Sequence, residues 1–434
     1  MIESLVIIGL FVLTLFTFYL VGVPVAYAMG LSVLSLMILP IGGSINIGVP
    51  AQRMFTGVDS FILLAVPAFL FAGKLMNSMG MTDDIFDFAE ELVGSIKGGL
   101  GHVNIVVSMI FSGMSGSAVA DAAGLGTIEY KAMNDRGYDS KLAAGITGSS
   151  AIIGPILPPS IIMIIYASAA QESVGALFIG GIIPGLLMGL ALMTMVYVIA
   201  LRNGMTASKT IRPKKLLKAT IKAVPALLAP VIIIGGILIG WFTPTEAAVV
   251  VVLYGLFLGL FYYRSLSLEQ LYNDIYSTVV DTAAILIILS LANLYAHWIT
   301  LNGIPLVIGD VLTSISGGAT TILLVIILVY LLLGTFIDAT AVILITVPML
   351  APVFPQLGID PIHFGVVGVL ALMIGLLTPP LGLILFVLEK VTDVGFSDIV
   401  RGVAPFYVPL LLVLGILVIF PELVLYLPNL FELG

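Results

Sequence analysis

Apolar runs separated by short polar connections fill almost the whole chain. Most of these runs approach the ~20 residues that a helix needs to cross the hydrocarbon core of a bilayer. The pattern therefore predicts an all-α polytopic membrane protein with ten spans. The predicted spans lie at about 4–21, 25–39, 58–80, 142–170, 175–201, 223–241, 245–263, 277–300, 362–388 and 396–420.

Four further apolar runs are too short to span separately. They form two consecutive pairs, at 100–112 with 117–127 and at 319–334 with 339–352. Backbone at membrane depth must be hydrogen-bonded or line a cavity. Each pair therefore fits a re-entrant hairpin that enters and leaves on one side, over about 100–127 and about 319–352.

The stretch Thr82–Lys97 differs from the spans because it is amphipathic. Helical spacing places its apolar residues on one face and five acids mainly on the other. We expect an interfacial helix along the inner membrane surface, and a solvated connecting helix is the alternative. The five acids are Asp83, Asp84, Asp87, Glu90 and Glu91.

The chain also repeats itself. The motif G-x-x-x-P-P occurs at residues 154–159 and again at 375–380, so that Pro158 and Pro379 are 221 positions apart. Internal repeats built around interrupted hydrophobic helices are typical of secondary transporters. We divide the chain into repeat one (1–201), a linker (202–222) and repeat two (223–434). Five spans per repeat, an odd number, predict that the second copy is inverted.

Basic residues support this topology. The linker carries seven Lys or Arg and no acid: Arg202, Lys209, Arg212, Lys214, Lys215, Lys218 and Lys222. With the linker in the cytoplasm, 15 of the 16 basic residues lie inside or at the inner boundary, and Arg53 alone lies outside. This predicts that both termini are periplasmic.

Composition narrows the class of protein. The chain is 60% hydrophobic and 9% charged, with a mean hydropathy of +1.23. Soluble domains are about 25% charged, so nearly all of the chain is expected in the membrane. Cysteine is absent, which excludes thiolate chemistry. The three histidines lack metal-ligand spacing and there is no H-E-x-x-H motif, so we expect no enzyme, and no nucleic-acid partner.

Two kinds of segment can expose backbone at membrane depth. They are the hairpin turns at 112–121 and 334–340 and the breaks at each Pro-Pro pair. A Pro-Pro pair removes two backbone donors and leaves carbonyls free. Such carbonyls, with nearby hydroxyls, suit Na⁺, and helix N-termini at the hairpin tips suit an anion. The alternatives are close packing through small residues and simple structural kinks.

Two acids fall within the hairpins. Intramembrane acids are functional candidates, although Asp121 is equally suited to be an N-cap. Asp338 lies in an almost wholly apolar stretch, where it could ligate sodium, bind substrate or carry a proton. Asp281 and Glu246 lie near predicted span ends, where anchoring or capping is the expectation. Polar residues concentrated at one depth argue against a channel, which needs a continuous polar path.

The motifs at 112–128 (SGMSGSAVADAAGLGTI) and 148–160 (GSSAIIGPILPPS) resemble the large membrane subunit of tripartite ATP-independent periplasmic (TRAP) transporters. The resemblance covers essentially the whole chain. It implies a sodium-driven elevator-type importer in the bacterial inner membrane, with scaffold and transport domains. It implies as partners a four-helix small membrane subunit, here a separate chain, and a periplasmic binding protein that delivers an organic acid. Sialic acid and C4-dicarboxylates are the substrate classes, with sialic acid favoured; a proton-coupled organic-anion carrier is the alternative.

The resemblance also implies site residues. The substrate would contact Ser117, Ser160 and Asp338. Copy two lacks the Ser-rich hairpin tip of copy one, so its ion site would rely more on backbone oxygens and Thr. Sodium would be held by Ser115, Ser117, Ser150, Gly154, Pro155, Gly334, Thr335, Gly375 and Thr378.

Overall fold

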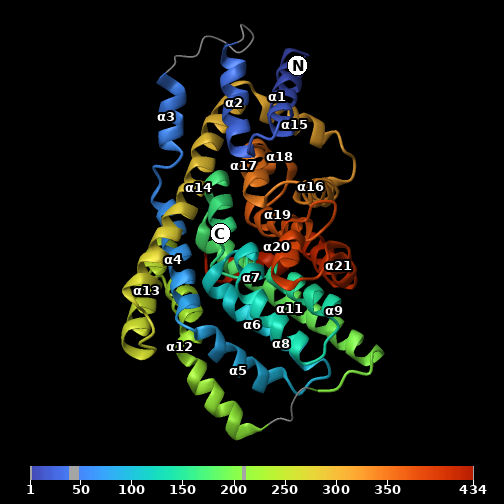
Figure 1. Cartoon of the computed structure of the whole chain (residues 1–434). Coiled ribbons are helices and arrows are strands. Elements are labelled where there is room, and N and C mark those ends of the chain that lie inside the picture. Colours follow the sequence, from blue (N-terminus) through green and yellow to red (C-terminus); the bar gives the residue numbers. More distant parts are fainter. Residues whose placement is uncertain (1, 39–47, 208–211, 434) are drawn as a thin grey trace.

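The protein is built from helices. A computed structural model describes residues 2–38, 48–207 and 212–433. Apart from one isolated antiparallel bridge between Lys97 and Ala207, these residues contain no β-structure. Figure 1 shows an elongated bundle, with the N-terminal helices at one end and the start of α12 at the other. The all-α class is therefore confirmed; Lys209 of the linker lies outside the described residues.

The described residues of the first half form eleven α-helices. They are α1 (Ile2–Leu20), α2 (Val25–Ile38), α3 (Gly48–Thr56), α4 (Ala65–Ser78), α5 (Met81–Val93), α6 (Gly99–Ser115), α7 (Ala118–Ala123), α8 (Leu125–Asp135), α9 (Ser140–Ala151), α10 (Ile161–Ala170) and α11 (Val174–Arg202). A short 3₁₀ turn, Phe61–Leu64, leads into α4.

After the linker, the part of the second half that the structure describes also forms eleven α-helices. They are α12 (Pro213–Leu238), α13 (Pro244–Phe257), α14 (Leu268–Leu301), α15 (Ile304–Thr313), α16 (Gly318–Gly334), α17 (Ala339–Leu350), α18 (Phe354–Leu357), α19 (Pro361–Leu376), α20 (Leu383–Thr392), α21 (Phe396–Ile419) and α22 (Glu422–Leu430).

Both Pro-Pro motifs interrupt a helix. In copy one, α9 ends at Ala151 and α10 begins at Ile161; in copy two, α19 ends at Leu376 and α20 begins at Leu383. Proline blocks the hydrogen bond to the preceding turn, so the chain crosses each motif as irregular backbone. Both Pro-Pro peptide bonds are cis. The order of a short-helix hairpin, a broken helix and a long helix recurs in the two halves, while the inversion of copy two stays a prediction.

Seven described helices are long and apolar enough to cross a membrane, and the bent pair α15–α16 would make eight. Six of the ten predicted spans are among these seven; the other four are α1, α2 and the interrupted pairs α9–α10 and α19–α20. The seventh helix is Ala339–Leu357, so the run predicted at 339–352 as too short to span separately is extended to a length that could span. The axes of α15 and α16 meet at 118°. Length and composition therefore establish a multi-pass protein, and the number of crossings stays a prediction.

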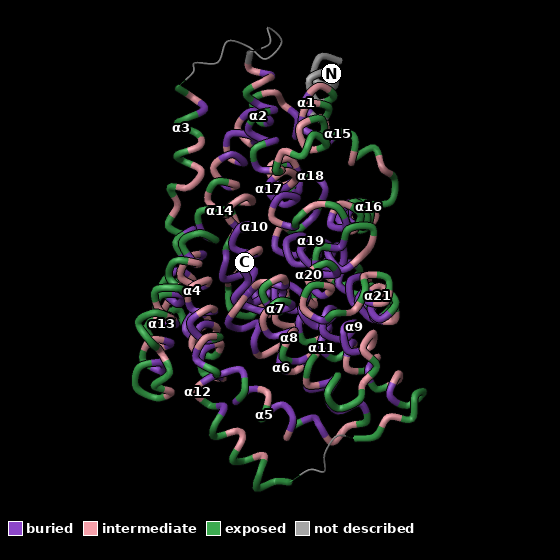
Figure 2. Tube along the Cα trace, in the orientation of Figure 1, coloured by how far each residue is buried: buried purple, intermediate pink, exposed green. Residues whose placement is uncertain are grey.

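The core surrounds α19. Every residue from Ile362 to Leu376 is buried, because α10, α11, α16 and α21 all pack against this helix. A helix that is apolar all round requires such a position. Figure 2 shows the buried trace in the middle of the bundle, and exposed residues along α12 and α13.

The amphipathic helix is α5, but its acidic face is only partly solvated. Asp84 is 6% exposed and accepts from Lys222 of α12 at 2.7 Å. The Tyr263 hydroxyl donates to the same carboxylate at 2.9 Å. Glu90 is 5% exposed and pairs with Arg136, which follows α8. Asp83 and Asp87 are exposed, whereas Asp84 and Glu90 tie α5 to neighbouring segments. The interfacial position of α5 stays a prediction.

Candidate functional site

A cavity of about 580 Å³ brings the two halves of the chain together. It opens between both hairpin turns, the N-terminal ends of α10 and α20, the C-terminal end of α19, and helices α4 and α14. Its lining residues with polar side chains are Lys74, Asn77, Ser115, Ser117, Asp281, Asp338 and Thr340. The remaining lining is apolar or glycine, which is the usual composition of a small-molecule site.

In each hairpin turn, the residue that caps the N-terminus of the second helix lines this cavity. Ser117 is the N-cap of α7, and its hydroxyl accepts from the Ala120 N–H at 3.4 Å. Asp338 is the N-cap of α17 and accepts from the Thr340 N–H at 2.9 Å. These two caps are 221 positions apart, the spacing of the Pro-Pro motifs. Of the two alternatives for Asp121, the N-cap role is wrong, because Ser117 is the N-cap of α7.

Helix N-termini converge on the cavity. Those of α10, α17 and α20 each contribute lining residues, and each of these helices has ten residues or more. Free N–H groups and the positive ends of helix dipoles favour an anion. The N-cap of α10 is Ser160, whose buried hydroxyl accepts from the Met163 N–H at 3.2 Å. Ser160 thus orients the helix end, while its neighbours Ile161 and Ile162 line the cavity.

Behind hairpin one lies a buried polar cluster. The Ser115 hydroxyl donates to Asp121 Oδ1. Asp121 is 2% exposed, and its Oδ2 has no hydrogen-bond partner among the described residues. Gly154, in the broken helix, lies against this oxygen, where a Cβ would meet it. A carboxylate oxygen without a partner, beside a glycine and irregular backbone, fits a small cation that prefers hard oxygen ligands.

Further buried polar residues of copy one lie on α6 and α9. Ser150 Oγ donates to Asn104 Oδ1 at 2.6 Å or to the Thr147 carbonyl oxygen at 3.0 Å. The Asn104 amide donates to Thr147 Oγ1 at 2.9 Å. Glu129 Oε1 is buried and has no partner in the described part of the chain. Sequence reasoning missed Asn104 and Glu129, although polar residues within apolar runs are a usable signal.

In copy two, the predicted residues of the hairpin turn lie against those of the break through their backbones. A Cβ on Gly375 would lie 2.7 Å from the Gly334 Cα, so α16 and α19 touch main chain to main chain. The Gly382 N–H donates to the Thr335 carbonyl oxygen at 3.2 Å, which joins the hairpin turn to the break. The hydroxyls of Thr335 and Thr378 donate to carbonyls of their own helices at 2.8 Å and 2.6 Å.

The predicted site residues therefore fall into two groups, those that line the cavity and those that do not. Ser115, Ser117 and Asp338 line the cavity directly. The other predicted residues are absent from its lining and occupy the hairpins and breaks of the two copies. Pro155 is buried beside Gly154. The ligand role of each residue stays a prediction.

Two acids near predicted span ends have different positions. Glu246 forms a capping box with Thr243 at the start of α13, so the expected capping role is confirmed. For Asp281 the expectation of a capping role is wrong, because this residue lies inside α14; the expectation of interfacial anchoring stays a prediction. The Asp281 carboxylate accepts from Lys74 at 2.5 Å, and both side chains line the cavity.

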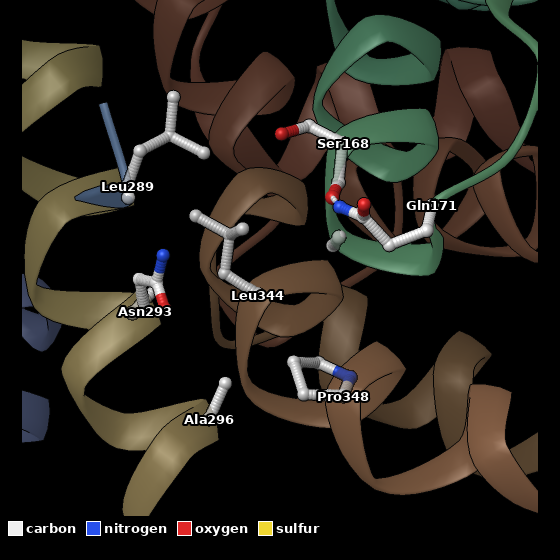
Figure 3. A pocket seen from close by; sticks show the side chains of 10 residues that line it. Ser168, Gln171, Leu289, Asn293, Ala296, Leu344 and Pro348 are labelled. Atoms are coloured by element: carbon white, nitrogen blue, oxygen red, sulfur yellow. Dashed lines mark hydrogen bonds between the residues drawn. The ribbon is translucent and has the colours of Figure 1, made fainter. Parts of the chain in front are cut away.

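A second, smaller cavity of about 140 Å³ lies between α14, α10 and α17. Figure 3 shows Asn293 of α14 facing Leu344 and Pro348 of α17, with Ser168 and Gln171 beyond them. None of the predicted site residues belongs to its described lining. The larger cavity is therefore the candidate site.

Fold and site together define a class: a polytopic helical membrane protein whose interrupted helices and hairpins meet at one cavity, where the N-termini of α10, α17 and α20 converge. The chain belongs to the family described as "Tripartite ATP-independent periplasmic transporter, DctM component", whose sequence model matches residues 12–423. This family implies a small membrane subunit and a periplasmic binding protein as partners. Relatives in the family are transporters.

Two curated relatives are named for sialic acid. "Sialic acid TRAP transporter large permease protein SiaM" of Vibrio cholerae is 46% identical over 94% of this chain and 96% of its own length. "Sialic acid TRAP transporter permease protein SiaT" of Haemophilus influenzae is 41% identical over 94% of this chain, which spans 66% of that protein.

Among solved structures, the YdaH transporter of Alcanivorax borkumensis is similar in fold. The TM-score is 0.63, at 14% identity, over 86% of this chain and 87% of that one. At this identity the likeness shows the fold alone.

Proposed function

We propose that this chain is the large membrane subunit of a sodium-coupled importer of an organic acid, acting by an elevator mechanism. The observation that carries the proposal is the cavity, where both hairpin turns and both interrupted helices meet. Binding sites formed by discontinuous helices near the bilayer midplane are the hallmark of secondary transporters.

Sodium coupling is supported by oxygen atoms in the hairpins and breaks of both copies. Copy one offers the unpartnered Oδ2 of Asp121 next to Gly154. Copy two offers the hydroxyls of Thr335 and Thr378, in the irregular segments that follow α16 and α19, next to the contact between Gly334 and Gly375. Cations bound there would offset the charge of an organic anion in the cavity, which links the binding of the two. One charge that moves down 100 mV supplies ~2.3 kcal/mol.

An elevator motion is supported by how the helices pack. Helices α4, α12, α13 and α14 form a connected set, in which α4 packs on α13 and α14. In the second set, α10, α16, α17 and α20 pack on α19, and α20 connects them to α7 and α9 of copy one. The two sets touch where α4 packs on α6 and α14 packs on α17. The cavity lies between the two sets. We propose that the second set moves with its cargo and the first set stays fixed.

Sialic acid is the proposed substrate, because relatives at 46% and 41% identity carry that substrate in their names. C4-dicarboxylates are the second class. The proposed partners are a separate four-helix membrane subunit and a periplasmic binding protein, and the proposed location is the bacterial inner membrane with both termini periplasmic. Exposed apolar side chains along α12 to α14, such as Val231, Leu253 and Val279, provide surface for lipid and for the small subunit.

Uptake in proteoliposomes tests the proposal. The large subunit is reconstituted with its small subunit, the binding protein is added outside, and labelled sialic acid or succinate is offered. We expect uptake that requires an inward sodium gradient and stops when choline replaces sodium. Countertransport of labelled substrate distinguishes a carrier from a channel, because only a carrier exchanges.

Proton coupling is the second candidate, and the buried acids of copy one are the observation that favours it. Asp121 and Glu129 each have an unpartnered carboxylate oxygen in the described chain, and a proton would satisfy such a group as a cation would. Uptake that follows an inward pH gradient and ignores sodium would establish this alternative and reject sodium coupling.

A further inference from the structure

We infer that Lys74 is the charge that recognises the carboxylate of the transported anion, and that Asp281 pairs with the Lys74 ammonium when no cargo is bound. This inference rests on the proposed function, because it requires an organic acid as cargo. It adds a substrate-recognition residue on α4, outside the hairpins and broken helices.

The first observation is the position of Lys74. Gly73, its neighbour, packs directly against hairpin one: a Cβ there would lie 2.8 Å from the Met114 carbonyl oxygen and 3.2 Å from Ser115 Cα. Helix α4 therefore touches the backbone of the turn that carries Ser115 and Ser117. Lys74 is the next residue along α4, and it lines the same cavity as these serines.

The second observation is the charge balance of the cavity. Among the described residues that line it, Lys74 is the one base, and Asp281 and Asp338 are two carboxylates. An anion entering a cavity with two like charges is repelled, and the repulsion is strong where water is scarce. Lys74 reduces that repulsion, and its ammonium on a flexible stem can follow a ligand.

The third observation is that the Lys74 ammonium is hydrogen-bonded while its side chain stays partly exposed to solvent. Its ammonium donates to Asp281 Oδ2 at 2.5 Å and to Ser277 Oγ at 2.8 Å, both on α14. The side chain of Lys74 is 26% exposed and that of Asp281 is 51% exposed. Solvent on the Asp281 side weakens the pair, so a substrate carboxylate can take the place of Asp281. The exchange keeps the ammonium paired with and without cargo.

The two members of the pair should therefore affect binding in opposite directions. Removing the ammonium with Lys74→Gln removes the attraction and should weaken anion binding. Removing the competing carboxylate with Asp281→Asn frees the ammonium and should tighten it. If the pair only braces α4 against α14, both substitutions break the same brace and should change binding in the same direction.

The experiment measures binding of labelled sialic acid to the purified complex of large and small subunits in sodium buffer, without the binding protein. We expect Lys74→Gln to raise Kd about tenfold, the loss expected for one charge-assisted contact. Asp281→Asn should lower Kd, and Lys74→Arg should retain most of the wild-type affinity. Lys218→Gln, an exposed lysine on α12, is the matched control and should leave Kd unchanged.

Equal or same-direction changes in Lys74→Gln and Asp281→Asn would overturn the inference, as would unchanged affinity in Lys74→Gln. Thermal unfolding of each variant separates loss of fold from loss of binding. If wild type binds no sialic acid, the same variants are compared with succinate. If wild type takes up one of the two acids but the opposite effects on Kd are missing, only the inference is rejected. If wild type takes up neither sialic acid nor succinate, the proposed function is rejected.

Discussion

The hairpin and broken helix of copy one and those of copy two follow one plan with different chemistry. In copy one, side chains supply the polar atoms: Asp121 and Glu129 are buried with unpartnered oxygens among the described residues. In copy two, Gly334 and Gly375 touch through their backbones, and the hydroxyls of Thr335 and Thr378 bond to their own helices.

The difference shows that two copies with the same backbone plan need not offer the same groups to an ion. Two cation sites built in this way would differ in charge. The site of copy one would include a carboxylate, and that of copy two only neutral oxygens. A carboxylate binds a cation more strongly but also attracts protons. We therefore expect the two sites to respond differently to substitution.

The largest effect is expected at Asp121. Asp121→Asn keeps the shape but removes the charge at the oxygen that faces Gly154, and should reduce sodium-driven uptake about ten- to a hundredfold. Thr378→Val, at the break of copy two, removes a hydroxyl already bonded to the Ile374 carbonyl and should have a smaller effect. Uptake against sodium concentration measures both. A greater loss in Thr378→Val than in Asp121→Asn would invert the comparison.

The two N-caps provide the next test. Ser117→Ala and Asp338→Ala each remove a cap worth about 1 kcal/mol and a polar group in the cavity wall. Both should lose uptake while the protein still inserts, as followed by membrane fractionation and labelled-substrate transport. Asp338→Asn retains an acceptor for the Thr340 N–H and isolates the charge. Normal uptake in both alanine variants would remove these residues from the site.

Glycine substitutions separate fold from ion binding. Gly375→Ala places a Cβ against the backbone of Gly334 and the Leu331 carbonyl oxygen, and this overpacking should cost about 1–3 kcal/mol and lower Tm. Gly154→Ala meets the Asp121 carboxylate, so it should change sodium dependence more than Tm. Gly415→Ala, with nothing within 4 Å, is the control and should not lower Tm. Equal loss of Tm in Gly154→Ala and Gly375→Ala would contradict this division.

The smallest effect is expected at Asn104, which joins α6 to α9 through Thr147 and Ser150. Asn104→Ala should cost about 1 kcal/mol, the net value of a typical hydrogen bond, seen as a modest fall in Tm. The exposed Asn429→Ala should stay within about 0.5 kcal/mol of wild type. A loss of sodium dependence in Asn104→Ala without a fall in Tm would make Asn104 part of the ion site.

The sequence by itself determined the helical class, the segments and the breaks. Apolar length and Pro-Pro pairs act locally, because a proline blocks the same hydrogen bond wherever the helix lies. The repeat spacing also marked the hairpin turns, and the N-caps Ser117 and Asp338 fall at that spacing. The resemblance identified the family, and the family match over residues 12–423 confirms it.

Only the tertiary structure decided which polar groups meet. Lys74 and Asp281 are 207 positions apart, and nothing in the pattern of either segment pairs them. Asp84 and Glu90 belong to an acidic face by helical spacing, yet two neighbouring helices bury them. Burial and partners depend on how helices distant in sequence pack, whereas helix ends depend on a few adjacent residues. The breaks were therefore predictable from the chain, and the charges around the cavity were not.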